Sequence, residues 1–167
     1  SDNGRVYHAQ SGLIGQHGPD GQAERPLYSA TLNAYELATG QNELKVELSY
    51  TDVQGVSYVK RFGFTRAHYD IAVGYTIKNL TPKPLAMRMF AQLKRDRVEA
   101  SKPEGFGMGQ VTYLGGAYSS ADKRFEKYDF DAMDKDNLAL TTAGGWVAML
   151  QHYFVSSWVP VKDVQNE

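Results

Sequence analysis

Residues 43–94 carry the clearest pattern in the chain, because apolar and polar positions alternate there with a period of two. The pattern covers four segments, and the apolar positions are Leu44, Val46, Leu48 and Tyr50; Val56, Tyr58, Phe62 and Phe64; Ile71, Val73, Tyr75 and Ile77; and Leu85, Met87, Met89, Ala91 and Leu93. This period is typical of β-strands with one buried face. Turn residues at 52–55 and 79–84 separate the strands. We therefore predict an antiparallel meander of four strands, whose apolar face needs a second layer.

The rest of the chain predicts shorter strands joined by loops. Strands are expected at residues 6–10, 27–37, 110–114, 117–119 and 125–130, a hairpin at 138–142 and 146–151, and a last strand at 152–160. Residues 11–26 and 95–109 are rich in glycine, proline or charge and indicate loops. No stretch keeps a helical apolar period for three turns. The last strand is too apolar for a sheet edge, so we expect a partner strand beyond it and a natural domain that continues further.

Composition narrows the class of protein. A length of 167 residues with 42% hydrophobic content suggests one domain, and 12% aromatic content favours an all-β fold. The formal charge of −1 provides no net field for nucleic acid or an anionic membrane, although a local patch stays open. The absence of cysteine excludes disulfides and thiolate metal sites. The longest apolar run, residues 146–150, is too short for a membrane helix. The N-terminus shows no signal peptide, which fits an intracellular chain or a piece of a longer one.

The residues that most often carry catalysis or bind metals show no working arrangement. The four histidines lack ligand spacing: His8, His17, His68 and His152. His68 lies two residues before Asp70, and a surface histidine is the better interpretation of that pair than an acid–base dyad. The turn at residues 17–21 holds His17, and its glycines, proline and aspartate are those of an ordinary turn. No serine lies in a nucleophile elbow.

Two further motifs resemble ligand loops only superficially. Residues 105–109 alternate glycine with Phe106 and Met108, but no helix pattern follows, so a dinucleotide loop fails on context. Carboxylates gather at Asp129, Asp131, Asp134 and Asp136, where calcium is the alternative. That run lacks the glycine and the closing glutamate of a calcium loop, and a solvated charged loop is the better interpretation. Residue chemistry therefore predicts a non-catalytic β domain without a cofactor.

Several segments together carry a family resemblance. They are residues 10–13, 18–20, 25–28, 40–44, 115–119, 125–130 and 144–154. In this order they resemble the large periplasmic domain of the YidC family of bacterial inner-membrane protein insertases. The Gly-Gly-Trp-Val-Ala-Met-Leu-Gln run at residues 144–151 is the most specific part. The resemblance covers residues 10–160 as a domain truncated at both ends, with residues 1–9 and 161–167 as flexible ends.

The resemblance implies a fold, a location and partners. The expected fold is an antiparallel twisted β-sandwich, called a supersandwich and similar to galactose mutarotases. The expected location is the periplasmic face of the inner membrane, where the parent protein inserts membrane proteins. Nascent membrane proteins would meet its membrane spans, which lie outside this chain. Residues 92–142 would contact the translocon subunit SecF, with SecD as a related partner. Within that region residues 99–109 depart from the family pattern.

The resemblance also implies the site residues, with alternatives left open. The implied partner-binding residues are Leu114, Gly115, Gly116, Ala117, Tyr118, Glu126, Lys127 and Tyr128. The same segments are equally explained as core strands, which alternating aromatic rings favour. A second function class is a carbohydrate-binding or mutarotase-like enzyme, because this fold serves both. Its weak candidates are His68 with Asp70, or His152.

Overall fold

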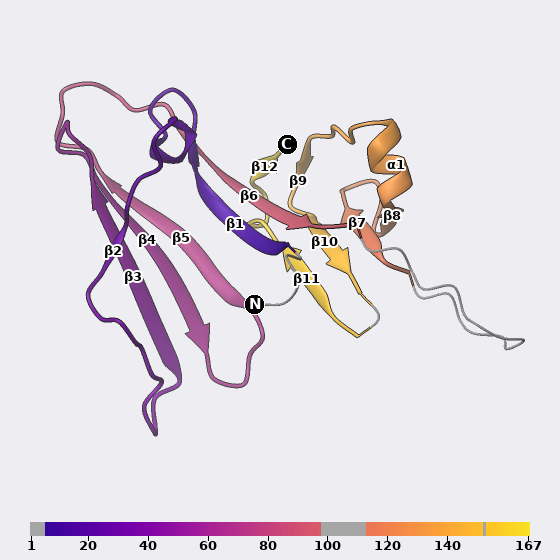
Figure 1. Cartoon of the computed structure of the whole chain (residues 1–167), viewed down its shortest axis with the longest axis horizontal. Coiled ribbons are helices and arrows are strands. Elements are labelled where there is room, and N and C mark those ends of the chain that lie inside the picture. The colour runs from indigo at the N-terminus through magenta and orange to yellow at the C-terminus, as the bar shows by residue number, and fades with distance from the viewer. Residues whose placement is uncertain (1–5, 98–112, 152) are drawn as a thin grey trace, which may run out of the picture. The chain divides into compact units, whose positions relative to one another are not determined.

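The computed structural model describes residues 6–97, 113–151 and 153–167 (Figure 1). Its elements in chain order are β1 (Tyr7–Ile14), a 3-10 turn (Pro19–Gly21), β2 (Ser29–Ala30), β3 (Glu43–Thr51), β4 (Ser57–Thr65), β5 (Ile71–Lys78), β6 (Arg88–Arg95), β7 (Gly115–Ser119), β8 (Glu126–Tyr128), α1 (Phe130–Lys135), β9 (Thr142–Ala143), β10 (Trp146–Leu150), β11 (Val155–Trp158) and β12 (Gln165–Asn166). The predicted all-β, antiparallel fold class is confirmed. Among these residues no helix is long and apolar enough to cross a bilayer.

The chain forms two compact units. The meander unit is Gly12–Phe90, and the β7 unit joins Ser1–Ser11 to Ala91–Glu167. The sequence suggested one domain over residues 10–160 with flexible ends. Within the chain, residues 7–9 belong to β1, and β12 near the C-terminus pairs with β9.

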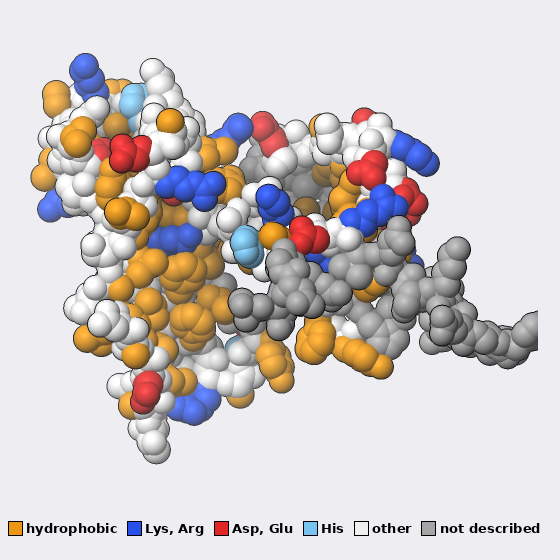
Figure 2. Space-filling model, viewed as in Figure 1, with side chains coloured by type: hydrophobic (Ala, Val, Ile, Leu, Met, Phe, Trp, Pro, Cys, Tyr) orange, Lys and Arg blue, Asp and Glu red, His pale blue; other side chains and the backbone are white. Residues whose placement is uncertain are grey.

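The meander unit is built on a sheet with strand order β2-β3-β4-β5. Its long strands are antiparallel, with Tyr50 opposite Tyr58 and Phe62 opposite Val73. Burial along β3 alternates at every residue, as the sequence predicted. Leu13, Val56 and Tyr58 form the buried core. Figure 2 shows hydrophobic side chains gathered over β3, β4 and β5, the face that the alternating pattern produces.

The predicted fourth strand does not join this meander, which corrects the sequence prediction. β6 pairs with β1 instead of β5. The reason lies in the connection, where the Asn79 side chain binds the Lys83 carbonyl and the Thr81 amide to form a wide turn. Beyond it the Ala86 amide donates to His17 Nδ1, and the His17 amide donates to the Ala86 carbonyl. These bonds direct the chain to the loop after β1 and away from β5.

The loop predicted at residues 11–26 is shorter than expected, because β1 extends to Ile14. A 3-10 turn follows, in which the Asp20 carboxylate accepts a hydrogen bond from the Leu13 amide at 2.7 Å. Gly15 has a φ of 112°, a left-handed conformation that favours glycine. The plain-turn interpretation of this segment accounts for its composition. The predicted strands at residues 27–37 reduce to β2.

The β7 unit contains a sheet with order β11-β10-β7-β8. The predicted hairpin of residues 138–142 with 146–151 is wrong, since β10 pairs with β7 and β11, while β9 pairs with β12. Gly144 and Gly145 have φ values of 70° and 84°, and a Cβ on Gly145 would lie 2.3 Å from the Ser119 carbonyl oxygen. These glycines therefore start β10 against the end of β7 instead of folding it back onto residues 138–142.

The last strand predicted from the sequence, at residues 152–160, corresponds to the shorter β11. β11 begins at Val155, and among the described residues it lies at the edge of its sheet. Trp158 Nε1 donates to the Gln92 carbonyl of β6 at 3.1 Å. The buried residues of this unit are Ala117, Ala148 and Met149, with Ala117 directly opposite Ala148.

Candidate partner-docking surface

The residues that the resemblance implied as partner contacts lie next to one another in the β7 unit. Leu114 precedes β7, and Gly116, Ala117 and Tyr118 lie opposite Tyr128, Lys127 and Glu126 of β8 in that order. The pairing of β7 with β8 therefore brings the two implied segments side by side. Their exposure differs: Gly115, Gly116 and Ala117 are buried, Leu114, Tyr118, Glu126 and Tyr128 are half-buried, and Lys127 is exposed.

Two adjacent glycines explain why β7 is buried on both of its faces. Neighbouring positions in a strand point to opposite faces. A Cβ on Gly115 would lie 2.8 Å from the Tyr113 hydroxyl, and a Cβ on Gly116 would lie 2.4 Å from Met133 Cε. Tyr113 therefore covers one face of the strand and α1 covers the other. Glycines inside a strand often mark such close approaches, which is a signal that sequence reasoning did not use for Tyr113 and Met133.

Helix α1 was absent from the sequence prediction, which assigned Asp129, Asp131, Asp134 and Asp136 to a solvated loop. Asp129 is instead the N-cap, and its carboxylate accepts from the Ala132 amide at 2.8 Å. The Asp136 amide closes the helix by donating to the Ala132 carbonyl. The helix has only six residues, fewer than two turns, so it is too short for a periodicity search to detect.

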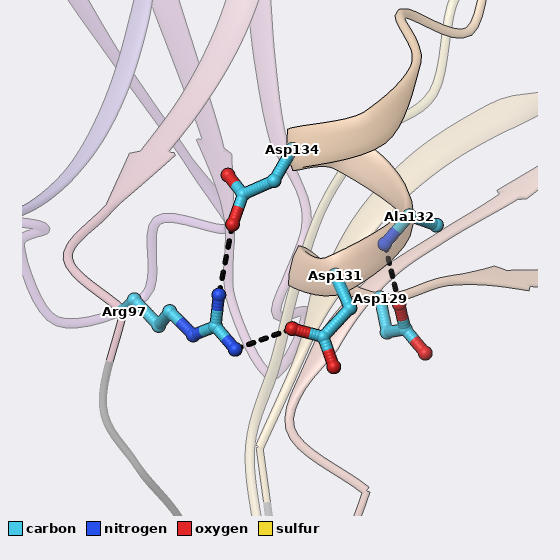
Figure 3. Close-up of polar contacts among 5 residues, drawn as sticks. All are labelled: Arg97, Asp129, Asp131, Ala132 and Asp134. Atoms are coloured by element: carbon cyan, nitrogen blue, oxygen red, sulfur yellow. Dashed lines mark hydrogen bonds and ion pairs between the residues drawn. The ribbon is translucent and has the colours of Figure 1, made fainter.

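Arg97 binds α1 through two carboxylates at once. Asp131 and Asp134 are three residues apart and thus lie on the same side of the helix. The Arg97 guanidinium donates to both, with a nitrogen–oxygen distance of 2.8 Å to Asp134 (Figure 3). All three side chains are more than half exposed, so each pair contributes little to stability alone. Together they hold the start of the segment after β6 beside α1.

The face opposite α1 carries an aromatic and basic cluster. Lys127 Nζ lies 4.7 Å from the centroid of the Tyr113 ring, whose hydroxyl donates to the Gly116 carbonyl at 2.5 Å. Burial, with Asp129 as the next cause, raises the pKa of Tyr113. Tyr113 and Lys127 also line an open pocket of about 420 Å³ with Leu150, Gln151, Tyr153, Phe154 and Val155. Its lining suits a protein or peptide contact better than proton-transfer chemistry.

Residues considered for catalysis or metal binding are dispersed. His68 Nδ1 lies 3.3 Å from Asp70 Oδ1, but both side chains are exposed, by 61% and 82%. His17 accepts from the Ala86 amide, and His8 is exposed on β1. No group of three potential metal ligands occurs in the part of the chain that the structure describes. His152 and residues 99–109 lie outside the described residues.

Comparisons with known proteins agree on one family. The family model described as YidC periplasmic domain matches residues 1–167. The chain is 50% identical over 159 residues to a membrane protein insertase YidC of Shewanella frigidimarina, which covers 95% of this chain and 29% of that protein. Proteins of the same name from Aeromonas salmonicida and Pseudomonas entomophila are each 46% identical, over 97% and 99% of this chain. The chain spans about three tenths of the length of these relatives.

Proposed function

Because this chain belongs to the YidC periplasmic domain family, we propose that it is a non-catalytic docking platform of a membrane protein insertase. The domain lies on the periplasmic side of the inner membrane. Its proposed partners are the translocon accessory subunits SecF and SecD. By holding them beside the insertase, the platform assists the insertion and folding of inner-membrane proteins, while nascent chains meet membrane-spanning parts outside this chain.

The observation that carries the proposal is the surface formed by β8 and α1. We define this β8–α1 surface by Glu126, Tyr128, Asp131 and Asp134 on the α1 side of the sheet and by Lys127 on the opposite face of β8. β8 is the last strand of its sheet, so among the described residues one of its edges has no strand partner. Exposed charges of both signs surround the half-buried side chains of Tyr128, which is aromatic, and Glu126, which is acidic. A mixed polar rim around a partly apolar centre is typical of reversible protein contacts.

Burial divides the eight implied residues into two groups. Gly115, Gly116 and Ala117 are covered by neighbouring strands, Tyr113 and α1, so a partner would not reach them without moving these elements. Their role is to hold β8 and α1 in place. Direct contact is therefore proposed for Lys127 and the exposed parts of Glu126 and Tyr128.

The test measures binding of the chain to the immobilised periplasmic domain of SecF by surface plasmon resonance. Reversing the charge at Lys127 (Lys127→Glu) removes the cation from Tyr113 and leaves a negative charge in its place, so we expect binding at least about fivefold weaker. Lys45→Glu is the matched control, because Lys45 is 74% exposed on β3 of the other unit. No binding by the wild-type chain, or equal effects of both variants, would refute the docking role.

Titration with sugars tests the alternative function, a carbohydrate-binding or mutarotase-like enzyme. Under the proposal, calorimetric titration of the chain with hexoses gives no saturable heat. Millimolar or tighter binding that disappears in His68→Ala would replace the docking platform with a carbohydrate-binding function. The exposure of His68 and Asp70 argues against this outcome, since an acid–base pair works best when it is shielded from water.

A further inference from the structure

One end of the meander sheet carries three aliphatic side chains that are almost fully exposed. The exposed fractions are 88% for Leu27, 103% for Val53 and 75% for Leu80. Single exposed apolar residues are common on protein surfaces. Three at one end of one sheet form a group, which we call the apolar tip (Leu27, Val53 and Leu80), and such groups often mark an interaction site.

Strand register places the three residues at the same end of the sheet. Thr51 lies opposite Ser57, and Ser57 lies opposite Lys78, so these residues form a row across the end of the sheet. Val53 follows Thr51 in the β3–β4 turn, and Leu80 follows Lys78 by two residues. Ser29 lies opposite Ser49, which puts Leu27 level with Thr51. Figure 1 shows the β3–β4 turn and the loop after β5 at the same end of the sheet.

Hydrogen bonds hold two of these side chains out in water. The Asp52 carboxylate accepts from the Gln54 and Val56 amides, both at 2.9 Å, which fixes the turn that presents Val53. The Asn79 side chain fixes the turn that presents Leu80 by binding the Thr81 amide and the Lys83 carbonyl. The aliphatic groups therefore cannot fold back without breaking their turns. A rigid protrusion loses little conformational entropy on binding.

Exposed basic side chains flank the apolar tip. Lys78, Lys83 and Arg25 are exposed at this end of the sheet. The nearby acidic residues are Glu24, Asp52 and Asp20. The Asp52 carboxylate accepts from amides of its own turn, and the Asp20 carboxylate accepts from the Leu13 amide of β1. A lysine close to an anionic membrane contributes attraction that adds to the burial of apolar groups.

We propose that the apolar tip inserts into the headgroup region of an anionic lipid bilayer, with Lys78 and Lys83 contacting lipid phosphates. This site is separate from the β8–α1 surface and does not rest on the docking function. A bilayer fits better than a protein partner for two reasons. The family places this domain beside a membrane, and protruding aliphatic tips with flanking lysines lack the broad packed centre of a protein interface.

The test is co-sedimentation of the 167-residue chain with vesicles of phosphatidylethanolamine and phosphatidylglycerol. The triple variant Leu27→Ser, Val53→Ser, Leu80→Ser is expected to reduce the bound fraction at a fixed lipid concentration, with a partition coefficient at least about tenfold lower. Tyr69→Ser is the matched control, because Tyr69 is 103% exposed at the opposite end of the same sheet. We expect it to bind like the wild type.

Charge is tested separately with Lys78→Gln, Lys83→Gln. This double variant should bind anionic vesicles several-fold more weakly than the wild type, and the two proteins should bind equally to vesicles of phosphatidylcholine alone. High salt should weaken the binding of the wild type to anionic vesicles by a similar factor. Lys127→Glu should sediment like the wild type, which keeps this result distinct from the docking test. The proposal is overturned if the wild-type chain does not sediment with anionic vesicles, or if the triple variant binds as well as Tyr69→Ser.

Discussion

Asp52→Ala should be among the most destabilising single substitutions in the meander unit, although Asp52 lies in a surface turn. Its carboxylate accepts hydrogen bonds from the Gln54 and Val56 amides and, at 3.2 Å, from the Tyr58 hydroxyl. Val56 is 0% exposed and Tyr58 is 2% exposed, and both belong to the buried core. The turn and the core are therefore joined through one side chain.

The expected magnitude follows from which donors lose their acceptor. The Gln54 amide is exposed, so water replaces the carboxylate there at little cost. The Val56 amide and the Tyr58 hydroxyl are shielded, and a buried donor without an acceptor costs about 1–3 kcal/mol. We therefore expect Asp52→Ala to lower the free energy of unfolding by about 3 kcal/mol, a large part of the roughly 5–15 kcal/mol typical of a domain.

Urea unfolding followed by two probes would measure this loss. Far-UV circular dichroism reports strands of both units, whereas Trp146 and Trp158, the two tryptophans of the chain, both lie in the β7 unit. The circular dichroism transition should shift to lower urea, and tryptophan fluorescence shows whether the β7 unit unfolds with it. Asp70→Ala is the control, because Asp70 is 82% exposed and pairs with an exposed histidine. Its effect should stay within about 0.5 kcal/mol.

A double-mutant cycle with Tyr58→Phe gives the sharper criterion. In the wild type Tyr58→Phe removes a hydrogen bond and should cost about 1 kcal/mol. In the Asp52→Ala background the same change removes a hydroxyl that has already lost its acceptor, so it should cost less or restore stability. A loss below about 1 kcal/mol for Asp52→Ala, or an equal effect of Tyr58→Phe in both backgrounds, would contradict this account of the turn.

Two further substitutions test α1 and Tyr58. Arg97→Gln should lower the free energy of unfolding by no more than about 1 kcal/mol. It should speed amide hydrogen exchange at Met133 and Asp136 and leave exchange in β10 unchanged. High salt should have the same effect on exchange in the wild type. Burial, followed by the charge of Asp52, raises the pKa of Tyr58 from 10.0 to about 12. The unfolded chain therefore loses this proton first. The contribution of Tyr58 to stability should be fully present below pH 10 and fall between pH 10 and 12, and Tyr58→Phe should make that fall shallower in urea titrations.

The sequence predicted local strands better than it predicted their partners. In β3, β4 and β5 the side-chain period, the turn at residues 52–55 and the antiparallel pairing of chain neighbours all agree, so the sheet follows from local information. β6 has the same kind of pattern, but its partner depends on hydrogen bonds between Ala86 and His17, 69 residues apart in the chain. No local pattern encodes a contact of that separation.

The candidate surface shows the same limit. The resemblance put the implied residues into two segments, and pairing of β7 with β8 brings those segments together. Which of them a partner reaches depends on Tyr113 and Met133, whose side chains cover Gly115 and Gly116. Met133 lies in a helix that begins at the Asp129 cap. Arg97 contacts the same helix through Asp131 and Asp134, which are 34 and 37 residues away from it in the chain. Those carboxylates looked like a solvated loop because their partner was not adjacent in sequence.

Burial of β7 also changes how a mutational map of this surface should be interpreted. A substitution at Gly116 would push against Met133 and the Tyr128 carbonyl, so it would displace α1 and β8 before it touched any partner. Loss of binding in such a variant would show that α1 and β8 had moved. Loss of binding in Lys127→Glu would instead show loss of the contact itself, because Lys127 is exposed and its backbone pairing with Ala117 is unchanged by the substitution. Amide exchange of α1 separates the two cases, since only the first should accelerate it.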